Sequence, residues 1–140
     1  MNSTTPNPNT VRINYAPSKP RQTVATNCMQ FHPGQVLATP GALALMQEHG
    51  IQPLQLLTRF VHGDWGDCPR DDIALNEQAL ADGSRLMGVY RLAEKSVLES
   101  MSRKERMRLP TIWLISDATI SEKDDPRERH VTTFLCPSEY

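Results

Sequence analysis

The sequence predicts an α+β fold, in which about three short helices pack on one face of a small antiparallel sheet. Two patterns predict it: signals that start and stop helices follow one another up to Gly83, and from Arg85 onward apolar residues recur at every second position. With 140 residues and 39% hydrophobic positions, the chain is long enough to bury a core of its own. We therefore expect one domain over residues 36–140.

Residues 1–35 are expected to form a disordered basic tail. They hold five of the 11 prolines, and their few apolar residues follow neither a helical nor a strand period. Their charged residues are all basic, namely Arg12, Lys19 and Arg21. Order should begin at Val36 to Ala38, a short extended piece that is the candidate for a further, N-terminal strand of the sheet.

Three helices are predicted before Gly83. The first covers Gly41 to His49 and follows a capping threonine and a first-turn proline. The second begins at Pro53, carries a broad apolar face and ends at His62-Gly63. The third follows Pro69 and has two aspartates in its first turn, where acids interact favourably with the helix dipole.

Three strands are predicted after the helices, with alternating patterns over residues 86–92, 112–117 and 131–136. No crossover helix is indicated between them, so they should form an antiparallel meander. Residues 93–108 join the first two strands and are much longer than the usual hairpin loop of about two to five residues. We expect them to project as an arm with helix-forming composition, and residues 119–129 to form a charged, solvated loop.

The formal net charge of −1 argues against a protein that coats nucleic acid through bulk electrostatics, so a basic binding surface has to be local. The basic end of the arm is the best candidate for contacts with phosphates. The alternative is that these side chains only keep the arm tip soluble. The candidate binding residues are Arg103, Lys104, Arg106 and Arg108 of the arm, together with Arg12, Lys19 and Arg21 of the tail.

A dense cluster of chemically active side chains follows the second helix, comprising His62, Asp64, Trp65 and Asp67. An imidazole beside carboxylates could ligate a divalent metal or act in acid–base catalysis. The structural alternative is that the aspartates shape turns and the tryptophan anchors the loop on the core. The spacing matches neither a calcium-binding loop nor an HExxH zinc motif, and no glycine-rich phosphate loop occurs. We expect no catalytic residue, bound metal or cofactor.

The three cysteines, Cys28, Cys68 and Cys136, form no CxxC pair. Cys68 could act as a nucleophile if His62 faced it, and a small buried cysteine is the alternative. The sequence shows no secretory leader and no apolar run close to the roughly 20 residues of a membrane-spanning helix. A reducing, cytoplasmic location without membrane contact is therefore expected.

Characteristic strings are spread over most of residues 33–140. They are Pro33 to Leu43, Leu56-Leu57 with Arg59, His62 to Asp67, Asn76-Glu77 with Ala79-Leu80, Trp113 to Ile115, and Thr132-Thr133 with Pro137 to Tyr140. In these strings the chain resembles a family of short proteins of proteobacterial plasmids and integrative elements, usually described as plasmid-related and sometimes as subunit M of a type I restriction endonuclease. The resemblance implies a mobile-element context and supplies no activity.

The restriction-subunit description finds no support in the residues. An adenine methyltransferase needs a glycine-rich cofactor loop and an Asn/Asp-Pro-Pro-aromatic motif, and this chain has neither. Relatives join the first two strands by a short turn, where this chain has residues 93–108. The arm and the tail are therefore the places where we expect a specialised partner to bind.

Three functions follow as hypotheses. The leading one is a non-enzymatic protein-interaction protein of a mobile genetic element, which binds a host or element-encoded protein, with inhibition of host defence as its specific form. The second is a nucleic-acid-binding accessory protein that uses the basic tail and the arm. The third is a small metal-dependent hydrolase centred on His62, Asp64 and Asp67. The sequence also leaves open whether the chain forms a homo-oligomer, since an exposed strand edge could pair two chains.

Overall fold

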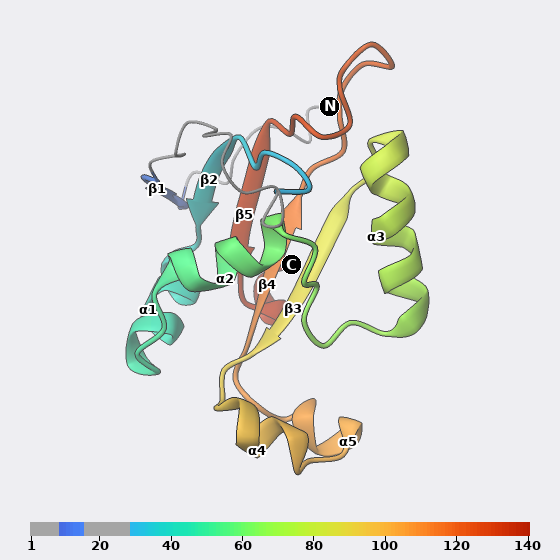
Figure 1. Ribbon diagram of the computed structural model, residues 1–140. Coiled ribbons are helices and arrows are strands. Elements are labelled where there is room, and N and C mark those ends of the chain that lie inside the picture. The colour runs from blue at the N-terminus through green and yellow to red at the C-terminus, as the bar shows by residue number, and fades with distance from the viewer. Residues whose placement is uncertain (1–8, 16–28) are drawn as a thin grey trace, which may run out of the picture.

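The computed structural model describes residues 9–15 and 29–140. In these residues five strands form one mixed sheet, in the order β1-β2-β5-β4-β3 (Figure 1). The strands are β1 (Val11–Ile13), β2 (Gln35–Ala38), β3 (Leu86–Arg91), β4 (Thr111–Ser116) and β5 (Val131–Leu135). Most of the helical residues precede the last three strands, and the predicted α+β class is confirmed.

The C-terminal strands β3, β4 and β5 form the antiparallel meander that the two-residue period predicted. The N-terminal extended piece is strand β2, which pairs with β5 in parallel, with Val36 opposite Thr132. Strand β1 adds an antiparallel edge to β2, with Val11 opposite Ala38. The sheet is therefore mixed and not purely antiparallel, because β5, which follows the helices, β3 and β4 in the chain, runs in the same direction as its neighbour β2.

The three predicted helices are α1 (Pro40–Glu48), α2 (Pro53–Val61) and α3 (Arg70–Asp82). Thr39 Oγ1 caps α1 by accepting a hydrogen bond from the Ala42 N–H at 3.0 Å, and Gly83 ends α3 at a φ of 82°. The chain also forms α4 (Lys95–Glu99), α5 (Arg103–Arg106) and the 3₁₀ turn η2 (Pro137–Glu139). In the described part of the chain, no helix has the length and apolar character needed to span a membrane.

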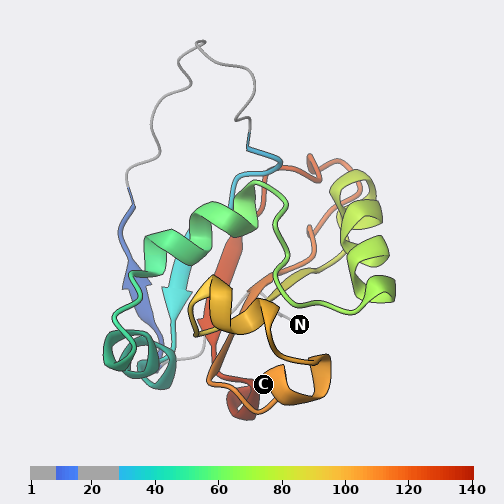
Figure 2. The ribbon, with the colours of Figure 1, turned by 60° about the horizontal axis from the view of Figure 1, so that its bottom comes forward.

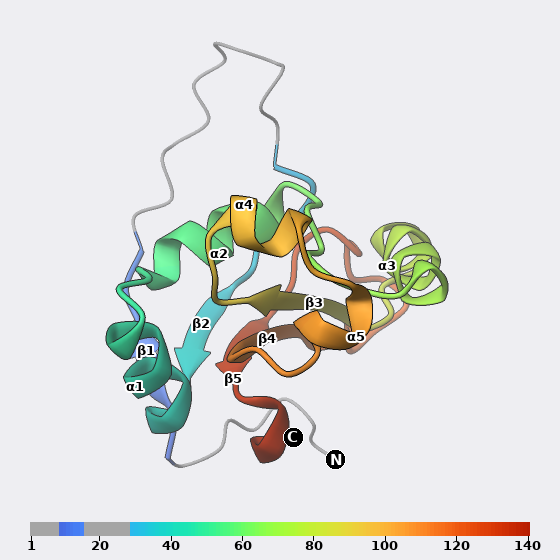
Figure 3. The same ribbon diagram turned by 90° about the horizontal axis from the view of Figure 1, so that it is seen from below.

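Helix α2 lies across one face of the sheet (Figure 3). It buries four apolar side chains in the main core: Leu56, Leu57, Phe60 and Val61. Helix α3 lies beside the edge strand β3, and α1 lies beyond the end of β2 (Figure 1). Helices α1 and α3 contribute buried side chains to the same core, namely Ala42 and Met46 from α1 and Ala79 and Leu80 from α3.

Part of the segment expected to be a disordered tail belongs to the folded domain. Strand β1 lies in it, and Phe31 is 1% exposed. The Phe31 ring meets Phe60 edge-on with 5.2 Å between the centroids, and lies nearly parallel to Trp65 at 6.3 Å. The expectation of disorder is corrected at these positions, because strand pairing and aromatic burial hold the chain. Residues 1–8 and 16–28, with Lys19, Arg21 and Cys28, lie outside the described residues.

The connection between β4 and β5 is more than a solvated loop. Arg129 in this connection is 4% exposed. Its guanidinium donates at 2.6–3.1 Å to four backbone carbonyls, those of Ala79, Ser84, Asp117 and Pro126. The Ala79 carbonyl belongs to the last turn of α3, where positive charge is favoured. The prediction of a solvated loop over residues 119–129 is therefore wrong at Arg129, whose side chain joins α3 to the loop.

Candidate binding site

Residues 93–108 form an arm with two short helices, α4 and α5, which extends beyond the ends of β3 and β4 (Figures 1 and 2). A reciprocal cap starts α5: Ser102 Oγ accepts a hydrogen bond from the Glu105 N–H at 3.2 Å, and Glu105 Oε1 accepts one from the Ser102 N–H at 2.7 Å. These hydrogen bonds lower the pKa of the Glu105 carboxyl. The acid in the basic end of the arm is thus bound to the arm's own backbone.

Asp67 holds the arm against the body of the domain. Its carboxylate accepts hydrogen bonds from Arg106 Nε at 3.1 Å and Nη2 at 3.0 Å, and from Arg91 Nε at 3.0 Å. The side chains of Asp67, Arg91 and Arg106 are 17%, 11% and 23% exposed, so solvent screens these ion pairs less than surface pairs. Burial raises the pKa of the Asp67 carboxyl, but the hydrogen bonds from the two arginines outweigh it, and the pKa lies below its ordinary value.

The backbone next to Asp67 runs along the outer edge of β3. The Val89 N–H donates to the Trp65 carbonyl at 2.9 Å, and the Asp67 N–H donates to the Val89 carbonyl at 2.7 Å. Gly66 allows this approach, because its φ is 75° and a Cβ there would lie 2.0 Å from the Val89 oxygen. The Asn76 side-chain amide makes two further hydrogen bonds to the β3 backbone, at 2.8 and 3.0 Å. These contacts fix Asp67 relative to the sheet.

The cluster of His62, Asp64, Trp65 and Asp67, for which a metal-binding or catalytic role and a structural role were both considered, has structural contacts. Asp64 accepts hydrogen bonds from Arg59 Nε at 2.7 Å and Nη2 at 3.3 Å, and Arg59 lies over the ring of Tyr90. Trp65 is 4% exposed and donates from Nε1 to Glu77 at 2.9 Å. Across residues 9–15 and 29–140, no group of three His, Cys, Asp or Glu side chains is placed to hold a metal ion. The contacts of Asp64, Trp65 and Asp67 favour the structural alternative.

Cys68 is buried, and its thiol donates to the Trp65 carbonyl at 3.3 Å. Burial raises the pKa of this thiol to about 11. The thiol is therefore protonated at neutral pH and is a poor nucleophile. His62 is exposed at the end of α2, where its Nδ1 lies 2.7 Å from the Thr58 carbonyl. These environments do not support a Cys–His catalytic pair.

The other cations at the basic end of the arm are exposed. Arg103, Lys104 and Arg108 form no ion pair with a carboxylate of the described residues, in contrast to Arg106. Met107 is 62% exposed in the same segment. The arm thus presents three positive charges that form no ion pair with a carboxylate of the described residues, together with an exposed apolar side chain.

The candidate cations of the arm and of the tail do not form one described surface. Arg12 lies on β1, and the strand order places β1 and β3 at opposite edges of the sheet. Lys19 and Arg21 lie outside the described residues. The structure therefore groups the four arm candidates and separates them from Arg12.

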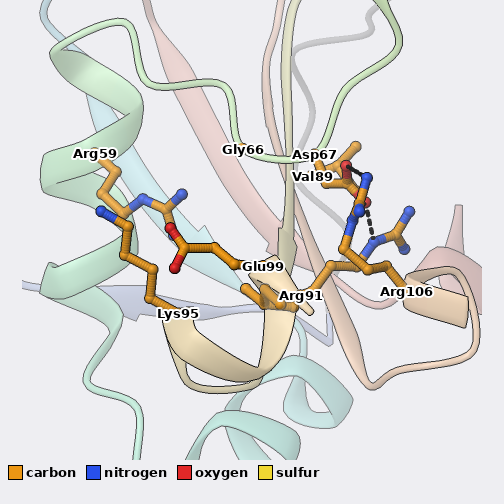
Figure 4. A pocket seen from close by; sticks show the side chains of 9 residues that line it. Arg59, Gly66, Asp67, Val89, Arg91, Lys95, Glu99 and Arg106 are labelled. Atoms are coloured by element: carbon orange, nitrogen blue, oxygen red, sulfur yellow. Dashed lines mark hydrogen bonds and ion pairs between the residues drawn. The ribbon is translucent and has the colours of Figure 1, made fainter. Parts of the chain in front are cut away.

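Two hollows flank the anchor, by which we mean Asp67, Arg91 and Arg106. A pocket of about 290 Å³ lies between α2, α4 and the loop at Gly66 (Figure 4). A groove of about 760 Å³ is lined by residues of α5, β3, β4 and η2, with Trp113 among them. Asp67 and Arg91 line both hollows, so a ligand in either one would lie near the ion pairs that hold the arm.

The pairing of Asp67 with Arg106 was not predicted. The sequence pattern assigned Asp67 to a metal site or a turn, and Arg106 to contacts with phosphates. The two residues are 39 positions apart, and opposite charges at such a separation carry no pairing signal in a single sequence.

Comparison of the chain with protein families, curated proteins and solved structures finds no match. The function is therefore inferred from the residues and their geometry.

Proposed function

We propose that this chain is a non-enzymatic interaction protein, which binds a protein partner through the arm. One observation carries the proposal. The cations Arg103, Lys104 and Arg108 are exposed and form no ion pair with a carboxylate of the described residues. They lie on a segment that Arg106 fixes to the domain at Asp67. A segment that is ordered before binding loses less conformational entropy on binding. Arginine and methionine side chains are also enriched at protein interfaces.

The charges of the arm indicate a partner with an acidic surface. Complementary charges steer the encounter of two proteins and fix their orientation. Met107 and Val97, which are 62% and 44% exposed, would add apolar contacts beside the ionic ones. The proposed partner therefore combines acidic and apolar side chains in one surface.

The resemblance to proteins of plasmids and integrative elements supplies the proposed context. We propose that the partner is a host or element-encoded protein, and that inhibition of a host defence protein is the specific form of this function. By covering an acidic surface, this chain would inhibit such a protein without catalysing a reaction. The aspartates that the hydrolase hypothesis needs, Asp64 and Asp67, are engaged by arginines, which favours binding over catalysis.

Nucleic-acid binding is the second candidate, and it is supported by the same exposed cations. The geometry favours it less. Of its described residues, Arg106 is paired with Asp67, and Arg12 lies at the opposite edge of the sheet from β3. The net charge of −1 also means that the rest of the chain would repel a polyanion.

Capture from a proteobacterial lysate, with and without nuclease, tests the proposal. The tagged chain is compared with a variant that carries Lys104→Gln and Arg108→Gln. The matched control carries Lys123→Gln and Arg70→Gln, which removes the same two side-chain types from exposed positions outside the arm and the tail.

We expect a stoichiometric protein that survives nuclease, is retained by the control and is lost from the arm variant. Loss of the captured material on nuclease treatment would indicate that the arm binds nucleic acid. Equal capture of a protein by all three chains would contradict a role of the arm.

A further inference from the structure

The pocket between α2 and α4 has more positive than negative charge around it. It is lined by four cations and two carboxylates: Arg59, Arg91, Lys95 and Arg106, with Asp67 and Glu99 (Figure 4). Asp64 also neutralises Arg59, through the ion pair at 2.7 Å. Four positive charges thus face three negative ones, and one positive charge is left over.

The excess charge is concentrated at the anchor, where the single carboxylate of Asp67 faces two guanidiniums. Arg91 donates from Nε to Asp67, and from Nη1 to Thr111 Oγ1 at 2.9 Å. Its Nη2 makes no hydrogen bond to the described residues, although the side chain is only 11% exposed. A largely desolvated guanidinium therefore keeps a donor available, and hydrogen bonds from such a group to an anion are strong.

Lys95 supplies a further positive group at the pocket. It is exposed, and its ammonium forms no ion pair with any carboxylate in the described ranges. Figure 4 shows Lys95 and Arg59 on one side of the pocket with Glu99 beside them, and Asp67 with Arg106 on the other side. An anion in the pocket would lie between these two groups of charges.

We propose that this pocket binds an oxyanion, and that in the complex the oxyanion is a carboxylate side chain of the protein partner. This inference rests on the proposed function and names the chemistry by which the arm site recognises its partner. A singly charged carboxylate matches the single excess positive charge. A phosphate dianion would exceed it and would be repelled by Asp67 and Glu99.

An NMR titration of the full, ¹⁵N-labelled chain tests the pocket at constant ionic strength. The probes are a blocked peptide with one aspartate between two glycines, the matched peptide with asparagine in its place, and inorganic phosphate. We expect the aspartate peptide to shift the Gly66 amide and the Arg91 Nε–H resonances, and the asparagine peptide to leave them unchanged. Equal shifts with both peptides, or no shift with either, would overturn the proposal. Shifts with phosphate alone would overturn the assignment to a carboxylate.

Two substitutions of opposite sign sharpen this test. Lys95→Gln should weaken binding of the aspartate peptide by about twofold to fivefold, the effect of one exposed charge near the ligand. Glu99→Gln should strengthen it by a similar factor, because it removes a carboxylate that repels the ligand. Lys123→Gln and Glu122→Gln are the matched exposed controls and should leave the affinity unchanged. Weakening by both Lys95→Gln and Glu99→Gln would contradict an electrostatic origin.

The two proposals fail in different ways. A captured partner that depends on Lys104 and Arg108, together with no response of the pocket to the aspartate peptide, would retain the interaction function and refute the pocket. Specific binding of the aspartate peptide, without any protein captured through the arm, would retain the pocket and refute the interaction function.

Discussion

Asp67 is the side chain on which the position of the arm depends. It joins Arg91 of β3 and Arg106 of the arm through one carboxylate. Only the ionised carboxylate makes both ion pairs, so its contribution to stability depends on pH. Folding lowers the pKa of this carboxyl, which means that protonation favours the unfolded chain.

Asp67→Asn should lower the free energy of unfolding at neutral pH by about 1.5–3 kcal/mol, the range for hydrogen bonds with charged groups. The contribution of Asp67 is fully present above the ordinary carboxyl pKa and is lost as the pH falls through the lower folded value. Urea unfolding of both proteins at about pH 7 and about pH 3 measures the effect. The difference between them should shrink in acid, and a constant difference would contradict an ionic anchor.

Gly66→Ala should destabilise the fold more than Gly50→Ala. Both glycines have a positive φ, 75° and 68°, which costs an alanine about 1 kcal/mol. At Gly66 the new Cβ would also meet the Val89 oxygen at 2.0 Å, whereas nothing lies within 4 Å at Gly50. We expect losses of about 2–4 kcal/mol and about 1 kcal/mol in urea unfolding. Equal losses would show that the loop does not depend on its close approach to β3.

The arm consists of two helices of five and four residues, α4 and α5. Isolated helices of this length are unstable in water, so their order depends on contacts with the rest of the fold. Neither helix buries a side chain completely. The ion pairs of Arg106 with Asp67 are therefore a main tie between the arm and the domain, and local opening of the arm should be easier than global unfolding.

Arg106→Gln should loosen the arm without unfolding the domain. Hydrogen exchange in α4 and α5 should become about tenfold faster, which corresponds to about 1.4 kcal/mol. Exchange in β4 and β5 requires opening of the whole sheet, so it should accelerate by no more than this factor and stay slower than exchange in the arm. Arg108→Gln is the matched control, since it removes the same kind of charge from an exposed residue without an ion pair in the described structure. Equal acceleration in both variants would refute the anchor.

The complete fold combines a body that is rich in acidic residues with a basic arm at the ends of β3 and β4. Residues 36–140 hold all 16 acids of the chain, yet one end of the arm carries four bases within six positions. Such a distribution suits recognition of a local acidic surface better than coverage of a long polyanion. The charge pattern of the chain and the geometry of the arm therefore point to the same class of partner.

Much of this arrangement could be predicted because its signals are local. Caps and prolines marked the ends of α1, α2 and α3, and the period of two marked β3, β4 and β5. The features that the sequence pattern missed join distant positions. Strand β1 pairs with β2, Phe31 enters the aromatic core, and Arg129 reaches a carbonyl 50 positions away. Such partners are selected by the folded chain and leave no periodic pattern in the sequence.

The candidate site, too, could be predicted only in part. Composition identified the basic end of the arm, and its cations Arg103, Lys104 and Arg108 are exposed. The cluster of His62, Asp64, Trp65 and Asp67 was equally visible, but residue types alone left open whether it was chemical or structural. Arginines from other elements occupy both aspartates, and only the fold shows which arginines these are.

The nuclease-treated capture from a proteobacterial lysate is the decisive test of whether the arm binds a protein partner. We expect that one protein is retained at stoichiometric amounts by the natural chain and by the Arg70→Gln, Lys123→Gln control, and is lost from the Lys104→Gln, Arg108→Gln variant. Retention of that protein by the arm variant, or loss of all bound material on nuclease treatment, would contradict it.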